Sequence, residues 1–448
     1  MNTRTTGIVA SLALLGSLAL TSCANGDDGA TEEAPTDDAG AATAESTEPI
    51  TLRVMSTTVV GAPEGPLEER IADDFMAENP NITIEFVGVA YNEYATKLTT
   101  IATGGDVPDV FANGPELYTR VNDLGIAADL GPLLGQDFLD GFAANILDES
   151  YIDDVLQYAP YYSIPQALIY RQDLFDAAGL EAPTTWDEFV DAAKTLTVDA
   201  DADGTTDQWG FAMVGTANGS GGSRFVPVLR TFGAQEMVQA SDGTWASGID
   251  SEGGIAALQL YGDLVNTHGV VPPGVLQTGY PEAVNLMSSG QTAMMVSGSN
   301  AIGAILAQAP DLEGKLASAP LPAGPDGETV TVLGQLGWSI AETSEHKEAA
   351  AEYIKFFLSK QNQIDWALTT GRLPVRSDAT GDAAFETPQY AGFIAAMENS
   401  IQLPPVPYYP NVQLMAAEAY QAVISGTPAE QAAADAATKI DQEIANNG

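Results

Sequence analysis

The sequence predicts an α/β fold with two lobes, and three observations support this prediction. The chain has 448 residues, 45% of them hydrophobic, so it can bury two cores of ordinary domain size. Between residues 50 and 87 a strand pattern, a helix pattern and a second strand pattern follow one another, which indicates a βαβ unit in a largely parallel sheet. The last quarter of the chain has the periodicity of long amphipathic helices.

The first elements follow from hydrophobic spacing. In residues 50–55, Ile50 and Val54 belong to an alternation of apolar residues that is typical of a strand with one buried face. A turn rich in Gly and Pro follows, and Leu67, Ile71 and Phe75 then recur at every fourth position, as in a helix. Residues 81–87 (NITIEFV) predict the second strand.

The later elements continue this alternation. We expect a helix near residues 116–123, and Thr185 with Glu188 forms a capping box that marks the start of another helix. Further strands are predicted at 109–111, 167–170, 210–214, 292–296, 316–319 and 331–333. Helices are predicted at 345–358, 389–397, 413–423 and 429–444.

Composition excludes several classes of protein. The chain has 16 Lys and Arg against 61 Asp and Glu, a net charge of −45, and would repel nucleic acids and anionic membrane surfaces. Its single cysteine cannot form an internal disulfide or build a zinc or iron–sulfur site alone. We find no phosphate-binding loop, nucleophile elbow or metalloprotease motif, so we expect no enzyme and no catalytic cofactor.

The N-terminus is typical of a secreted protein. Residues 7–20 carry no charge, follow the basic Arg4 and lead into Leu-Thr-Ser before Cys23, as in a signal peptide too short to span a bilayer comfortably. This ending resembles the bacterial lipobox, which implies a lipoprotein signal peptide at 1–22 and a lipidated, palmitate-bearing Cys23. Residues 24–48 hold eight acids and no base, so we expect 23–49 to be a disordered tether. The alternative is a plain signal peptide with an incidental cysteine.

An acidic loop has the spacing of a calcium site. Carboxylates occupy positions 1, 3, 5 and 9 of the loop that begins at Asp199, and Gly204 stands at position 6. Position 12, usually a bidentate Glu, is Gly210, so the loop is incomplete or is simply an acidic turn. The predicted ligands of a structural Ca²⁺ are Asp199, Asp201, Asp203, Thr205 and Asp207.

Five short motifs carry a resemblance to a known family. They are GGDVPDV at 104–110, the segment from IP at 164–165 through IY at 169–170 to DLF at 173–175, PTTWDEF at 183–189, APLP at 319–322 and GRLPVR at 371–376. In this order they resemble the extracellular solute-binding proteins (family 1) of bacterial ABC sugar importers, which include maltose- and trehalose-type binding proteins. The resemblance covers nearly all of residues 50–446. One departure is YRQD at 170–173, where the family usually has Tyr-Asn-Lys-Asp.

The resemblance implies a two-lobed fold of the periplasmic-binding-protein type (type II) that closes on a solute. Lobe 1 would comprise 50–163 and 338–388, lobe 2 would comprise 168–334 and 398–448, and the hinge crossings would be 164–167, 335–337 and 389–397. The protein would be an extracytoplasmic monomer, held at the outer face of the cell membrane by its lipid alone. It would deliver a sugar, such as an oligosaccharide, to the transmembrane subunits of an ABC permease.

A sugar site needs aromatic rings beside hydrogen-bonding groups, preferably on loops at the carboxyl ends of strands. Asn113 and Glu116 follow the strand at 109–111, and Glu116 falls near a sugar-binding acid of maltose-type relatives. Trp338 has small neighbours, which favour an exposed stacking platform. Arg224 follows a Gly-rich turn, and Asn300 stands where many relatives place a stacking Trp. Further aromatic candidates are Tyr162, Tyr408 and Tyr409.

Each candidate has a structural alternative, namely a helix-start carboxylate, a core aromatic or a surface arginine. Three functional alternatives also stay open. Acid pairs are abundant, so a secreted glycan-degrading enzyme is one of them. A binding protein for a polyol or a peptide is another. A calcium-dependent adhesion module is the third, although it should repeat the 199–207 loop, which occurs once.

Overall fold

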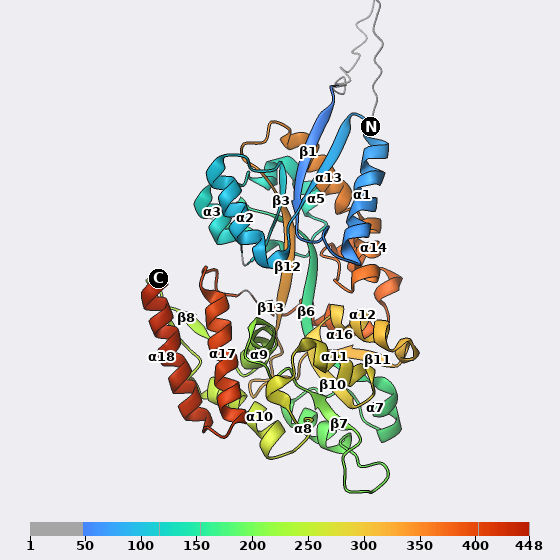
Figure 1. Ribbon diagram of the computed structural model, residues 1–448, viewed down its shortest axis with the longest axis vertical. Coiled ribbons are helices and arrows are strands. Elements are labelled where there is room, and N and C mark those ends of the chain that lie inside the picture. Colours follow the sequence, from blue (N-terminus) through green and yellow to red (C-terminus); the bar gives the residue numbers. More distant parts are fainter. Residues whose placement is uncertain (1–47, 116, 153, 402, 448) are drawn as a thin grey trace, which may run out of the picture. The chain divides into compact units, whose positions relative to one another are not determined.

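A mixed sheet organises the part of the chain that the computed structural model describes, residues 48–447 except Glu116, Asp153 and Gln402 (Figure 1). Within these residues the sheet has nine strands, ordered β2-β1-β3-β12-β6-β10-β7, with β11 paired to β6 and β13 paired to β12. The predicted signal peptide, Cys23, most of the acidic tether and Glu116 lie outside the described residues. No helix of the described part is both long and apolar enough to cross a membrane.

One group of elements, drawn in the upper half of Figure 1, is called the N-terminal lobe here. Its parallel strands confirm the predicted βαβ unit, because β1 pairs with β2 on one side and with β3 on the other. Its strands are β1 (Ile50–Ser56), β2 (Ile82–Gly88), β3 (Val110–Asn113), β4 (Tyr151–Ile152) and β5 (Val155–Leu156). Its helices are α1 (Glu64–Glu78), α2 (Tyr91–Gly104), α3 (Tyr118–Leu124), α4 (Leu130–Leu134), α5 (Gln136–Leu139), α6 (Ala144–Asp148), α13 (Lys347–Phe357), α14 (Lys360–Thr370) and α15 (Ser377–Thr380).

Two long strands connect this lobe with the rest of the chain. β6 (Ala159–Arg171) and β12 (Thr331–Ile340) pair antiparallel with each other, and the far end of β6 pairs with β10 and β11 (Figure 1). The sheet is therefore mixed, and the prediction of a largely parallel sheet is wrong at these strands. The reason is that a strand returning from one lobe to the other runs against its neighbour.

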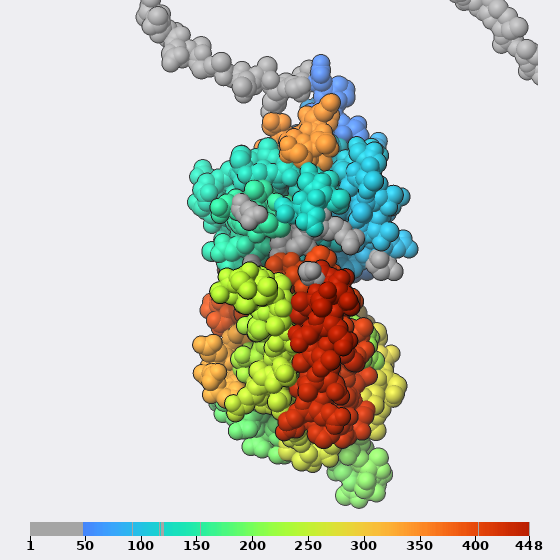
Figure 2. All heavy atoms as spheres, turned by 90° about the vertical axis from the view of Figure 1, so that its left-hand side faces the viewer, coloured from blue at the N-terminus to red at the C-terminus, as the bar shows by residue number. Residues whose placement is uncertain are grey.

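The second group of elements is called the C-terminal lobe. Its strands are β7 (Trp209–Ala212), β8 (Met237–Gln239), β9 (Trp245–Ser247), β10 (Thr292–Gly298), β11 (Leu316–Ala319) and β13 (Ser400–Ile401). Its helices are α7 (Gln172–Ala178), α8 (Trp186–Thr195), α9 (Gly219–Thr231), α10 (Glu252–Asn266), α11 (Tyr280–Ser288), α12 (Asn300–Gln308), α16 (Pro388–Met397), α17 (Tyr409–Ile424) and α18 (Ala429–Asn447). Figure 2 shows α17 and α18 lying together on one face of this lobe.

Two clusters of buried apolar side chains form the core. One takes residues from β1, β3, α1, α13 and α14 and extends to α11 and α12. The other takes residues from α8, α9, α10, α17 and α18. These clusters confirm that a chain of this length and composition forms more than one apolar core.

The capping box at α8 shows how local sequence fixes a helix start. The Glu188 amide donates to Thr185 Oγ1 at 3.2 Å, and α8 begins at Trp186 as predicted. The returning bond differs from the prediction, because Glu188 Oε2 accepts from the amide and hydroxyl of Thr184, each at 2.8 Å. These bonds lower the pKa of Glu188.

Candidate functional site

A cavity of about 590 Å³ lies where the two lobes meet β6 and β12, and it is called the interlobe cavity here. This volume falls within the roughly 300–1,000 Å³ that small-molecule sites occupy. Its walls come from both lobes and from the connecting strands. The lining residues are Tyr91, Pro115, Tyr162, Ile164, Gln166, Gly219, Ser220, Ser223, Arg224, Val332, Leu333, Gly334, Gln335, Arg372, Leu403, Pro410 and Gln413.

The start of α9 forms one wall because its sequence allows a close approach to α17. The Asn218 side chain caps the helix by accepting from the Gly221 amide at 2.9 Å. A Cβ on Gly222 would collide with the backbone carbonyl of Gln413 on α17, so glycine is required there. This packing sets Ser220, Ser223 and Arg224 along the interlobe cavity.

Arg224 is held by neutral partners. Its Nη1 donates to the Ser220 carbonyl at 2.9 Å and to Ser220 Oγ at 2.8 Å, and its Nη2 donates to Ser297 Oγ at 3.1 Å. Its guanidinium carbon lies 4.5 Å from the centroid of the Tyr280 ring. Burial lowers the pKa of Arg224, because the charged form loses hydration. Its Nε is buried without a hydrogen-bond partner.

Arg372 occupies a similar place beside another tyrosine. Its guanidinium carbon lies 4.7 Å from the centroid of the Tyr162 ring, and its Nη2 pairs with Glu64 Oε1 at 2.8 Å. Its Nε and Nη1 are buried without partners. Tyr161 meets the Tyr162 ring edge-on, with centroids 4.9 Å apart, so Tyr162 is fixed by packing.

Two glutamines complete the polar lining. Gln335 on β12 is 8% exposed, yet neither its Oε1 nor its Nε2 has a partner, and Gln166 Oε1 on β6 is also buried without one. Buried polar atoms nearly always have partners in native proteins. Together with the arginine N–H groups, these atoms offer donors and acceptors to a solute with many hydroxyl groups.

The structure brings two predicted residues, Tyr162 and Arg224, to this cavity. Asn300 is not a lining residue but contacts one of their neighbours. Its Nδ2 donates at 3.4 Å to the hydroxyl of Tyr280, whose ring lies against the guanidinium of Arg224. The other lining residues were not predicted, and Tyr91, Gln166, Gln335 and Arg372 are among them. Arg372 stands in the GRLPVR motif, Gln335 falls at the start of the expected hinge crossing 335–337, and Tyr91 is 53% exposed at the start of α2.

The prediction of an exposed platform at Trp338 is wrong. The indole is 0% exposed, stacks on Tyr161 with centroids 4.9 Å apart and meets Phe357 edge-on. The small neighbours serve another purpose, because a Cβ on Gly337 would lie 2.5 Å from the Ala159 carbonyl of β6. Glycine at this position allows the two connecting strands to approach each other, and the indole is packed beneath them.

Three further candidates are turned away from the interlobe cavity. Asn113 is fully buried. Its Nδ2 donates to Ser339 Oγ at 3.0 Å and its Oδ1 accepts from the Gly114 amide at 2.9 Å, so its side-chain amide is already hydrogen-bonded within the protein. Tyr408 and Tyr409 are 6% and 5% exposed and pack in the apolar cluster of the C-terminal lobe. Their proline-rich surroundings mark the start of α17.

The acidic loop gathers some of its predicted ligands. Carboxylate oxygens of Asp199, Asp201 and Asp207 lie within 4.8 Å of one another, and all three residues are exposed. Asp203 Oδ1 is turned elsewhere and accepts from the Thr205 amide at 2.7 Å. Gly204 has φ 91°, as the sharp turn requires. The group could hold a hard cation through three carboxylates rather than through the full predicted set.

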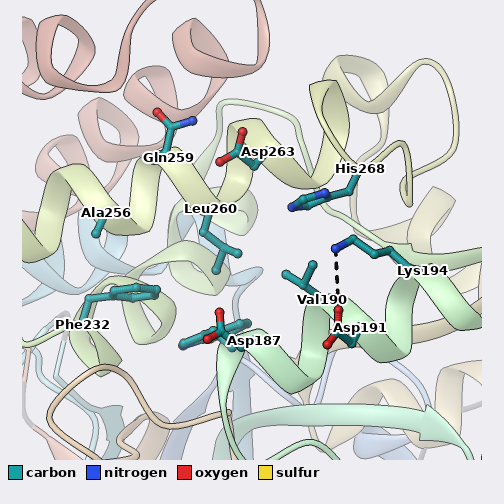
Figure 3. A pocket seen from close by; sticks show the side chains of 11 residues that line it. Asp187, Val190, Asp191, Lys194, Phe232, Ala256, Gln259, Leu260, Asp263 and His268 are labelled. Atoms are coloured by element: carbon teal, nitrogen blue, oxygen red, sulfur yellow. Dashed lines mark ion pairs between the residues drawn. The ribbon is translucent and has the colours of Figure 1, made fainter.

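A second hollow, also of about 590 Å³, lies within the C-terminal lobe between α8 and α10 (Figure 3). Trp186 and Phe232 form its apolar part, with their rings stacked at 6.1 Å. Its polar side chains have partners or face water. Lys194 Nζ pairs with Asp191 at 3.6 Å, and Asp263 accepts from Thr267 Oγ1 at 2.6 Å. It is called the α8–α10 hollow below.

Comparison with known proteins decides the family. Residues 61–364 match the family described as bacterial extracellular solute-binding protein, which is more than half of the chain. The chain belongs to this family.

Curated relatives agree over most of the chain. A putative binding protein of Brucella abortus is 27% identical, and the alignment covers 86% of this chain and 92% of the relative. A probable amino-acid ABC transporter periplasmic-binding protein of Sinorhizobium fredii is 25% identical, covering 84% and 86%. The diacetylchitobiose binding protein of Streptomyces coelicolor is 25% identical, covering 76% and 77%.

Solved structures confirm the two-lobed α/β fold. Maltose-bound MalE3 of T. maritima has a TM-score of 0.70 with 25% identity and covers 87% of this chain and 99% of its own. The sugar-binding protein MalE of Xanthomonas citri has a TM-score of 0.76 with 20% identity, covering 88% and 98%.

Proposed function

We propose that this solute-binding protein captures a sugar, of oligosaccharide size, in the interlobe cavity and delivers it to the transmembrane subunits of an ABC permease. The observation that carries the proposal is the set of buried, unpartnered polar atoms on Gln166, Arg224, Gln335 and Arg372 around one cavity. Sugar hydroxyls both donate and accept, so they can satisfy amide oxygens and guanidinium N–H groups together. Tyr91 supplies exposed aromatic surface for the C–H face of a sugar ring, and Tyr162 lines the same cavity.

Binding would be non-covalent and would leave the solute unchanged. The names of two similar proteins support a sugar, because one is a diacetylchitobiose binding protein and the other was solved with maltose bound. The name of the Sinorhizobium fredii relative, an amino-acid binding protein, favours a non-sugar solute as the second candidate. A glycan-degrading enzyme would cleave the saccharide, and the experiment below detects cleavage products.

Calorimetry of the purified protein against a panel of neutral oligosaccharides, polyols, amino acids and short peptides tests the proposal. We expect one-to-one binding of a saccharide, weakened in Tyr162→Ala and unchanged in Tyr151→Ala, a matched control at an exposed tyrosine of β4. Chromatography of the saccharide after incubation should recover it intact. Cleavage products would favour the enzyme, and binding confined to amino acids or peptides would favour the second candidate.

The N-terminal segment supports a lipid anchor at Cys23 and an extracytoplasmic location on the cell membrane. The acidic residues after it would hold the folded part away from the membrane surface. Cys23→Ser should move the protein from the detergent phase to the aqueous phase in a phase-partition assay of producing cells. A variant that stays in the detergent phase would contradict the anchor.

The 199–207 loop is proposed to bind a structural Ca²⁺ through Asp199, Asp201 and Asp207, because three close carboxylates repel one another without a cation. A thermal melt should shift upward with Ca²⁺ and downward with EDTA, and Asp201→Asn should reduce both shifts. Identical melting curves under the three conditions would remove the calcium proposal.

A further inference from the structure

The described residues that line the interlobe cavity carry a charge opposite to that of the protein as a whole. The chain carries a net charge of −45, with 61 acids against 16 Lys and Arg. Yet the described residues that line the cavity include two arginines and no Asp or Glu. Glu64, which is not a lining residue, pairs with one of the two arginines, Arg372. The described part of the walls therefore keeps a net positive charge in an acidic protein.

Arg224 is exceptional among the arginine side chains that the structure describes. Of the arginine side chains that the structure describes, all others form an ion pair with a carboxylate: Arg53, Arg70, Arg171, Arg230, Arg372 and Arg376. Arg224 has only hydroxyls and one carbonyl as hydrogen-bond partners. In a protein with so large an excess of acids, a guanidinium without a carboxylate indicates that its counter-ion comes from elsewhere.

Both guanidinium groups belong to residues that line the cavity and keep N–H groups without a hydrogen-bond partner. Each group has a tyrosine ring against its face, Tyr280 for Arg224 and Tyr162 for Arg372. A guanidinium over a ring directs its N–H groups outward in its own plane, where they match carboxylate or phosphate oxygens. Arg224 Nε and Arg372 Nε and Nη1 are the N–H groups without partners. The positive end of the α9 dipole, at Gly219 and Ser220, also lies on this cavity.

We infer that the solute of the interlobe cavity is an anionic sugar, whose carboxylate or phosphate group pairs with Arg224 beside Arg372. This inference rests on the proposed function, because it names the chemical class of the sugar bound at the same site. An anion would supply the counter-ion that Arg224 lacks, and burial of the pair would strengthen the attraction. A neutral sugar would leave the guanidinium charge uncompensated.

Matched pairs of probes test the charge and identify its source. Calorimetry compares digalacturonate with its dimethyl ester, and trehalose 6-phosphate with trehalose, beside the neutral panel described above. We expect the anionic member of one pair to bind roughly tenfold or more tightly than its neutral partner, as charge-assisted hydrogen bonds imply. Preference within the first pair indicates a carboxylate, and preference within the second indicates a phosphate.

Three variants tie the preference to Arg224. Arg224→Gln should abolish most of the difference between the anionic and neutral members. Arg224→Lys keeps the charge but loses the planar guanidinium, so it should show a reduced preference for the anionic member. This variant replaces Arg224→Gln in the test if the glutamine variant does not fold. Arg70→Gln, at an exposed position of α1 that does not line the cavity, should bind all probes as the wild type does.

The outcomes separate the two claims. Binding of neutral saccharides with no preference for an anionic one overturns the inference and leaves the proposed function standing. An anionic preference that persists in Arg224→Gln also overturns it. If no saccharide of either charge binds, both claims fail.

Discussion

Two hollows of the same volume, about 590 Å³ each, differ in how their polar groups are satisfied. The interlobe cavity has buried, unpartnered atoms on two glutamines and two arginines, and no described acid among its lining residues. The α8–α10 hollow has three aspartates, and none of its lining side chains is among the buried unpartnered groups of the described residues (Figure 3).

This difference teaches that volume does not identify a binding site here. A free protein that leaves buried donors and acceptors unpaired loses stability, and a ligand can recover that loss. A hollow whose polar groups are paired or hydrated offers a solute no such gain. Substitutions in the interlobe cavity should therefore change the affinity for the solute, whereas substitutions in the α8–α10 hollow should leave that affinity unchanged.

The largest change in the free energy of unfolding is expected for Trp186, a lining residue of the α8–α10 hollow. Trp186 is 7% exposed, donates from Nε1 to Thr231 Oγ1 at 2.9 Å and packs edge-on against Phe189. Trp186→Ala should lower the free energy of unfolding by about 3–5 kcal/mol, as large-to-small core substitutions do. Urea unfolding measures this loss, and calorimetry well below the melting temperature should give an unchanged affinity. A clear loss of affinity would mean that this hollow takes part in binding.

A smaller change in the free energy of unfolding is expected for Glu68 of α1, which has an unpartnered buried oxygen and lies outside both hollows. Glu68 Oε2 accepts from Ser56 Oγ at 2.9 Å and from Thr58 Oγ1 at 2.6 Å, while its Oε1 has no partner. Burial raises the pKa of Glu68 to about 7 from the usual 4.5. Below pH 4.5 both the folded and unfolded states are protonated. As pH rises to about 7 only the unfolded state loses its proton, so folding stability falls.

Glu68→Gln should therefore be more stable than the wild type at pH 8, by at most about 3 kcal/mol, and similar to it at pH 4.5. Urea unfolding at both pH values measures the difference. Glu69→Gln, at the exposed neighbouring position, is the matched control. Solute affinity should stay constant in both variants. Equal pH dependence of the wild type and Glu68→Gln would contradict the shift.

A still smaller change, with opposite signs in stability and affinity, is expected at Gln335. Gln335→Leu removes two unpartnered buried atoms, so the free protein should gain about 1 kcal/mol or stay unchanged. Solute affinity should fall roughly tenfold, because a hydrogen-bonding group of the site is lost. Gln259→Leu, at the edge of the α8–α10 hollow, should leave affinity unchanged. A loss of stability in Gln335→Leu would show that its amide is already satisfied.

The smallest effect is expected for Asp263→Asn in the α8–α10 hollow. The substitution keeps an oxygen to accept from Thr267 Oγ1 and should change stability by no more than about 0.5 kcal/mol. Calorimetry should give the wild-type affinity. A reduced affinity would break the contrast between the two hollows.

The sequence predicted the fold better than the site, for physical reasons. Hydrophobic periodicity reports which face of an element is buried, and it correctly placed the strands and helix from residue 50 to residue 87. It does not report the direction of a strand that connects two lobes, so the antiparallel pairing of β6 and β12 was missed.

Side-chain direction decided which predicted site residues were right. Tyr162 and Arg224 reach the interlobe cavity, because β6 and the start of α9 present them there. Asn113 stands at a strand end, as the rule for α/β sheets requires, but its amide turns to Ser339 and Gly114. Small residues around Trp338 suggested exposure, whereas they serve the close approach of β6 and β12. Gln335 gave no signal in the sequence, because its missing partners are visible only in three dimensions.

A crystal structure with bound solute tests the central claim most directly. We expect the solute to lie between Tyr162, Arg224 and Gln335, with its polar groups hydrogen-bonded to the Gln335 amide and to the guanidinium of Arg224. A solute seated in the α8–α10 hollow, or one in the interlobe cavity that leaves Gln335 and Arg224 unpartnered, would contradict the account.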